Sequence, residues 1–134
     1  MRVPLSVVFA LLLVGSPAAA GEPDLYRLSA TLTPGDPGRA ALRVTVADGW
    51  KWNAEFPFKL VVEEQEGCAL SRTTFGRDDG RVDEGGRAAT VDLGAAGKVG
   101  PASRVKGKVT FSVCNDKVCR FFRGVAVEWI VARP

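Results

Sequence analysis

The chain has 134 residues, with 18 Lys and Arg, 15 Asp and Glu, and no His, which gives a formal net charge of +3. The absence of His excludes Ser-His-Asp and Cys-His nucleophilic sites, as well as His-ligated zinc and blue-copper centres. The basic residues are scattered among acidic ones rather than gathered in a stripe. We therefore expect no nucleic-acid partner. Residues 21–134 contain no long apolar run, so we also expect no stable insertion into a membrane.

The first twenty residues are typical of a secretory signal peptide. Arg2 supplies a positive charge, residues 7–14 are apolar, and Ala18-Ala19-Ala20 forms a small-residue cleavage pattern. The apolar run is too short to span about 30 Å of hydrocarbon. We therefore expect cleavage after Ala20, and a single periplasmic or secreted domain over residues 21–134 that is soluble and monomeric.

Short runs of alternating apolar and polar residues follow in chain order. They predict strands at 26–32, 40–46, 58–62, 89–93, 105–113 and 125–131, with a weaker strand from Cys68 to Phe75. The glycine- and charge-rich segment 76–87 lacks the regular acidic spacing of a calcium loop and is expected to be a solvated loop. About seven short strands without a helical period predict an all-β fold, an immunoglobulin-like antiparallel β-sandwich.

The last two runs flank the short polar segment 115–118, with Cys114 and Cys119 at its ends. This pattern predicts a β-hairpin in which the two cysteines face each other across the strands. Directly opposed Cβ atoms lie about 4.5–5.5 Å apart, within a small adjustment of disulfide geometry. We therefore expect a disulfide or a reactive dithiol at the hairpin tip, with Cys68 free and largely buried on its strand.

The alternation contains one conflict inside this hairpin. Cys114 has the parity of Lys106 and Lys108 and is expected to point away from the core. Counting back from Val125 by twos, however, places Cys119 on the core side. One extra residue reconciles the two faces, and Gly124 is the natural place for a β-bulge.

Thiol–disulfide exchange needs no histidine, because a thiolate attacks the disulfide directly. Charged residues close to the cysteines are Asp116, Lys117, Arg120 and Arg123. The cations favour thiolate and the acid opposes it. Phe121 and Phe122 are candidates to shield the sulfurs, whereas Phe111 is expected in the core. Three cysteines without a fourth soft ligand make a poor metal site, so we expect neither a metal nor a cofactor.

Loop entropy separates the possible cysteine pairings. A bridge between Cys114 and Cys119 closes a very small loop, worth about 2 kcal/mol, whereas a bridge from Cys68 to either would be worth about 4 kcal/mol. A disulfide selected for stability alone would favour the long closure. The short closure makes better sense where its redox state is used.

Three blocks of the chain resemble the N-terminal periplasmic domain of the DsbD family of thiol:disulfide interchange proteins. They are Leu42 to Asn53, residues 74–76 and Lys106 to Val127, in the family's order. The resemblance implies an immunoglobulin-like fold in which Cys114 and Cys119 pass electrons from a membrane domain to periplasmic partners. It also implies that Phe75 caps the disulfide.

The chain departs from the family pattern at several points. Four residues rather than five separate the hairpin cysteines, the cap lacks the neighbouring acid and tyrosine, and Cys68 is additional. The family's membrane and thioredoxin-like parts are also missing from this sequence. A separate membrane electron carrier or thioredoxin-like protein would therefore be the redox partner.

Two hypotheses stay open at this point. In the first, the protein is an exported exchange module, a thiol:disulfide oxidoreductase of the protein-disulfide reductase type, with Cys114 and Cys119 as its catalytic pair. In the second, it is a non-catalytic binding or structural domain, and the hairpin disulfide only staples the fold.

Overall fold

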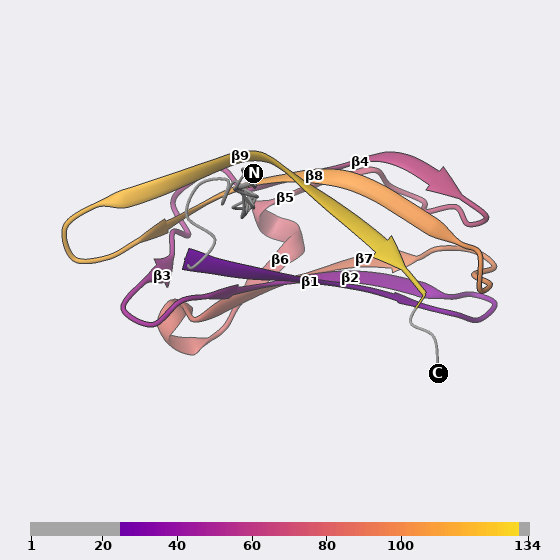
Figure 1. Ribbon diagram of the computed structural model, residues 1–134, viewed down its shortest axis with the longest axis horizontal. Helices are drawn as coiled ribbons and strands as arrows, with labels where there is room; N and C mark the ends of the chain where they lie inside the picture. Colours follow the sequence, from indigo (N-terminus) through magenta and orange to yellow (C-terminus); the bar gives the residue numbers. More distant parts are fainter. Residues whose placement is uncertain (1–24, 132–134) are drawn as a thin grey trace, which may run out of the picture.

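The computed structural model describes residues 25–131, so the predicted signal peptide lies outside the described residues. Within them the fold is all-β, with two antiparallel sheets packed face to face (Figure 1). The first sheet has the order β1 (Tyr26–Thr33), β2 (Arg39–Val46), β7 (Ala88–Ala95), β6 (Gly80–Val82). The second contains β3 (Lys51–Trp52), β4 (Lys59–Glu66), β5 (Thr74–Gly76), β8 (Arg104–Cys114) and β9 (Cys119–Ile130).

β8 is the central strand of the second sheet. It pairs with β9 along one side, and with β4 and then β3 along the other, while β5 pairs with β4. Leaving aside the two-residue β3, the orders 1-2-7-6 and 5-4-8-9 correspond to the two sheets of an immunoglobulin-like sandwich. The predicted fold class is therefore confirmed.

The core lies between the two sheets and contains the apolar residues of the predicted alternation. Leu42, Leu60, Val109 and Phe111 are fully buried. Trp129 on β9 is also fully buried, and its indole N–H donates a 2.8 Å hydrogen bond to the carbonyl of Ala41 on β2. This bond joins the two sheets and satisfies the polar group that burial of an indole would otherwise leave without a partner.

The structure corrects three expectations about the middle of the chain. The strand expected from Cys68 to Phe75 is only β5, so Cys68 lies outside any strand and is half-buried rather than largely buried. The segment 76–87 is not simply a loop, because it contains β6 and two short 3-10 helices, η2 (Arg77–Asp79) and η3 (Glu84–Gly86). β6 has three residues and β3 has two, so both are too short to show an alternation of apolar and polar residues in the sequence.

The predicted bulge at Gly124 is confirmed. Val109 faces Val125 and Phe111 faces Phe122, so Arg123 and Gly124 together oppose the single residue Thr110. Gly124 has φ +61°, a left-handed conformation that glycine adopts at little cost, and its N–H donates to Thr110 Oγ1 at 3.0 Å. The extra residue brings Cys119 to the same outer face as Cys114.

Candidate functional site

The hairpin between β8 and β9 has its turn at one end of the molecule (Figure 1), and a disulfide joins the two strands beside this turn. Cys114 is the last residue of β8 and Cys119 is the first residue of β9, and the two are register partners. Their sulfurs are covalently bonded, and Cys68 is a free thiol. The expected pairing is therefore confirmed.

The side chain of Asn115 organises the four-residue turn. Its Oδ1 accepts 2.8 Å hydrogen bonds from the backbone N–H groups of Lys117 and Val118. The N–H of Asn115 donates to the carbonyl of Val118 at 2.9 Å. This is the local chemistry by which Asn favours tight turns, and it places the cysteines opposite each other without help from the disulfide.

The two sulfur-bearing residues differ in their surroundings. Cys114 is half-buried and lies between two strands, since it faces Cys119 on β9 and Lys51 on β3. Cys119 is exposed and stands on β9, which pairs within the sheet with β8 alone. An incoming thiolate therefore has the more open approach to Cys119 Sγ.

Aromatic rings cover the outer face beside the disulfide. Phe121, two positions from Cys119 and 53% exposed, packs against Phe56 with 5.3 Å between ring centroids. The Arg123 guanidinium lies over both rings, 5.7 Å from Phe56 and 5.9 Å from Phe121. Beneath them Ser112 is fully buried although it lies on the outer face of β8. Of the two predicted shielding residues on β9, Phe121 lies on the face of the cysteines.

Phe122 lies on the opposite face of the hairpin. Its ring packs toward the core, with centroids 5.2 Å from Phe111 and 4.7 Å from Tyr26. Phe111 is fully buried, as expected from the sequence. Phe122 therefore supports the hairpin from below and does not cover the sulfurs on the outer face.

Phe75 lies far from the disulfide. It is 2% exposed on β5 and faces Leu60, which in turn faces Val109 on β8. Val109 precedes Cys114 by five positions, or roughly 17 Å at the rise of a β-strand. The structure does not bring Phe75 to the sulfurs, because pairing of β5 with β4 turns its ring into the core. The cap implied by the resemblance is corrected accordingly.

The sequence pattern did not predict that Lys51 and Phe56 lie near the disulfide. Both belong to the aromatic segment that links β2 to β4. Asn53 fastens this segment to β8, because its N–H donates to the Ser112 carbonyl at 2.9 Å and its Nδ2 donates to Ser112 Oγ at 3.3 Å. β3 has only two residues, so its sequence shows no alternation that could have predicted that Lys51 and Phe56 lie near the disulfide.

Cys68 is at the other end of the sandwich. Its Sγ lies 3.9 Å from the carbonyl oxygen of Arg104, the first residue of β8, whereas Cys114 is the last. Burial raises the pKa of the Cys68 thiol, partly offset by the contact with that carbonyl. A raised pKa favours the less reactive thiol form. Cys68 therefore lies away from the hairpin disulfide and is not expected to take part in exchange there.

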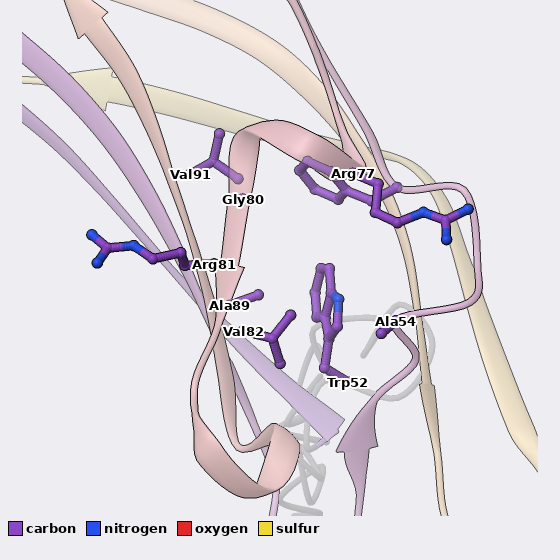
Figure 2. A pocket seen from close by; sticks show the side chains of 9 residues that line it. Trp52, Ala54, Arg77, Gly80, Arg81, Val82, Ala89 and Val91 are labelled. Atoms are coloured by element: carbon purple, nitrogen blue, oxygen red, sulfur yellow. The ribbon is translucent and has the colours of Figure 1, made fainter.

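A small apolar pocket opens between β3 and β6, at the edge of the sandwich (Figure 2). Figure 2 shows the Trp52 ring pointing into it, with Val82 and Ala89 on one side and Ala54 on the other. The volume of this pocket is about 40 Å³. This is far below the roughly 300–1,000 Å³ of pockets that hold drug-sized ligands.

The described residues offer no group of three or more Cys, Asp or Glu side chains placed to hold a metal ion. Between residues 25 and 131, no helix has the length and apolar character needed to cross a membrane. Comparisons of the chain with protein-family models, curated proteins and solved structures find no match. What is established is therefore a disulfide-bonded, immunoglobulin-like β-sandwich with its disulfide at the tip of the last hairpin.

Proposed function

We propose that this protein is an exported thiol–disulfide exchange module whose working pair is Cys114 and Cys119. The observation that carries the proposal is the position of the disulfide, exposed at Cys119 on an edge strand. Structural disulfides of secreted domains are generally resistant to reduction, whereas exposed ones are the labile or catalytic class.

The hairpin has other means of holding its shape. Nine further register pairs join β8 to β9, from Arg104 with Ile130 to Val113 with Arg120. The Asn115 turn and the packing of Phe122 on Phe111 add local support. Because the disulfide closes a loop with a sequence separation of 5, it adds only about 2 kcal/mol by loop entropy. Opening it should therefore leave the domain folded.

The exchange proceeds by two thiolate displacements. A partner thiolate attacks Cys119 Sγ, the Cys114–Cys119 bond breaks, and its electron pair leaves on Cys114 Sγ as a thiolate. The thiolate of the partner's second cysteine then attacks the partner sulfur that is bonded to Cys119 Sγ in the mixed disulfide. Cys119 leaves as a thiolate. The partner is oxidised to a disulfide and the hairpin is reduced to a dithiol, a transfer of two electrons. The reverse sequence reduces a partner disulfide.

The resemblance of the hairpin block to the DsbD family supports this role. It also supports a thioredoxin-like protein or a membrane electron carrier as the partner, since each supplies a dithiol or disulfide. A formed disulfide is typical of oxidising compartments outside the cytosol. It therefore supports the periplasmic or secreted location that the signal peptide predicts.

A trapping experiment tests the proposal. The thioredoxin-like protein used carries only one of its two active-site cysteines, activated as a mixed disulfide with thionitrobenzoate. The Cys114→Ser variant keeps the exposed Cys119, which displaces thionitrobenzoate from the partner. Because neither protein then has a second thiolate to break the new bond, this variant should form a lasting mixed disulfide with the partner. The matched Cys119→Ser variant, which keeps only the half-buried cysteine of the pair, should form this adduct more slowly. Both are made in a Cys68→Ser background. If both variants keep the native fold and neither forms an adduct, the result would favour the alternative hypothesis, in which the hairpin disulfide only stabilises the fold.

A further inference from the structure

Strand β3 places a lysine directly across from the less exposed hairpin cysteine. Lys51 is the register partner of Cys114, and Trp52 is the partner of Val113. Side chains of directly opposed residues share one face of a sheet, with Cβ atoms about 4.5–5.5 Å apart. Since Cys114 lies on the outer face, Lys51 carries its ammonium on the same face as the disulfide.

The backbone of β3 is held by its neighbours. The hydrogen bond from the Asn53 N–H to the Ser112 carbonyl joins the end of β3 to β8. Gly86 of η3 packs so closely that a Cβ added to it would lie 3.2 Å from Lys51 Cβ and 3.4 Å from the Trp52 nitrogen. Lys51 is therefore held next to Cys114 by its strand rather than by a loop.

The Lys51 ammonium is available to a new negative charge. Its side chain is exposed, and the ion pairs found between residues 25 and 131 do not include it. Other charged residues lie on the neighbouring elements: Glu84 in η3, Glu55 in the segment after β3, Asp116 and Lys117 in the turn, and Arg120 and Arg123 on β9. Among these, Lys51 is the one aligned with Cys114 across a pair of strands.

We infer that Lys51 is the charge that stabilises Cys114 as a thiolate when the hairpin disulfide opens. The inference rests on the proposed function and deepens it. In the first displacement the electron pair of the broken S–S bond arrives on Cys114 Sγ, and the ammonium opposite it compensates the new charge. In the reverse direction the same thiolate attacks Cys119 Sγ and expels the partner. The position of Lys51 opposite Cys114 therefore identifies Cys114 Sγ as the leaving and resolving sulfur. Cys119 Sγ is then the sulfur that bonds to the partner.

Alkylation of the reduced protein tests this assignment without any exchange partner. Trypsin cuts after Lys108, Lys117 and Arg120, so Cys114 and Cys119 fall in separate peptides, Val109–Lys117 and Val118–Arg120. Mass spectrometry of these peptides after timed treatment with iodoacetamide at a series of pH values gives a rate for each sulfur. In Lys51→Gln the rate for Cys114 at pH 7 should fall about 3-fold, the effect of one charge at about 6 Å in water.

Three comparisons make the result specific. Lys51→Arg keeps the charge and should restore most of the wild-type rate. Lys59→Gln removes an exposed lysine from β4 of the same sheet and should leave the rate for Cys114 unchanged. The difference between wild type and Lys51→Gln should also shrink in 1 M salt, which screens exposed charges. An alkylation rate for Cys114 that is unchanged in Lys51→Gln would overturn the assignment. A rate that falls as much in Lys51→Arg or in Lys59→Gln as in Lys51→Gln would also overturn it.

The assay separates this inference from the proposed function. A protein that fails to exchange with any thioredoxin-like partner, but whose Cys114 alkylation still depends on the Lys51 charge, would support the inference and refute the function. Rapid exchange with a partner, together with a Cys114 alkylation rate that does not depend on the Lys51 charge, would support the function and refute the inference.

Discussion

Replacing Cys114 and Cys119 together by serine measures how much the disulfide contributes to the fold. The bridge has a sequence separation of 5, so it closes one of the smallest loops a disulfide can close. Chain entropy for such a loop gives about 2 kcal/mol, compared with about 4 kcal/mol for a closure of roughly fifty residues. The nine other register pairs of the hairpin and the Asn115 turn do not depend on it. We expect the double variant to lose about 2–3 kcal/mol of unfolding free energy and to stay folded at room temperature.

Urea unfolding followed by Trp fluorescence measures this loss, with the wild-type protein in reducing buffer as the matched control. The reduced wild type and the double variant should have the same transition midpoint. Their denaturant dependence should match that of the oxidised protein, because the surface exposed on unfolding hardly changes. A double variant that is unfolded at room temperature, or a loss beyond about 5 kcal/mol, would show that the hairpin needs its staple and would refute this reasoning.

Further predictions concern the bulge, the core, one carboxylate and export. Gly124→Ala places a Cβ at φ +61° and should cost roughly 1–2 kcal/mol in urea unfolding, whereas Gly100→Ala, with nothing within 4 Å of the added Cβ, should cost little. Trp129→Phe loses the inter-sheet hydrogen bond and some packing, and the same assay should show a loss of about 2–4 kcal/mol. Asp79 has a lowered pKa, chiefly through the hydrogen bond it accepts from a backbone N–H and then through an arginine. Its stabilising contribution is therefore complete above about pH 4, the ordinary range of a carboxyl, and is lost as the pH falls through the lowered pKa; the stability gap between wild type and Asp79→Asn should close below pH 4. N-terminal sequencing of the exported protein should begin at Gly21.

The sequence was sufficient to predict the hairpin because its signals are local. Alternation along the two strands and the polar link between the cysteines predicted their pairing. The conflict between the parity of Cys114 and that of Cys119 required an extra residue, and Gly124 was the position that tolerates it. The fold class followed in the same way from short strands with turn residues between them.

The remaining features depend on contacts between distant segments. Lys51 and Phe56 reach the hairpin through β3, which has only two residues and shows no period. Phe75 was placed at the disulfide by resemblance, whereas the pairing of β5 with β4 buries it elsewhere. Cys68 was expected on a strand that runs to Phe75, yet the strand there begins only at Thr74. A pattern within one segment does not specify which strand will lie beside it.

The reduction potential of the Cys114–Cys119 pair tests the central claim most directly. Equilibration of the protein in dithiol redox buffers, followed by alkylation and mass analysis, gives this potential. An exchange module should have a value above about −300 mV, the region of labile disulfides, with the protein folded in both redox states. A potential well below about −300 mV would contradict the account and identify the hairpin disulfide as a structural staple.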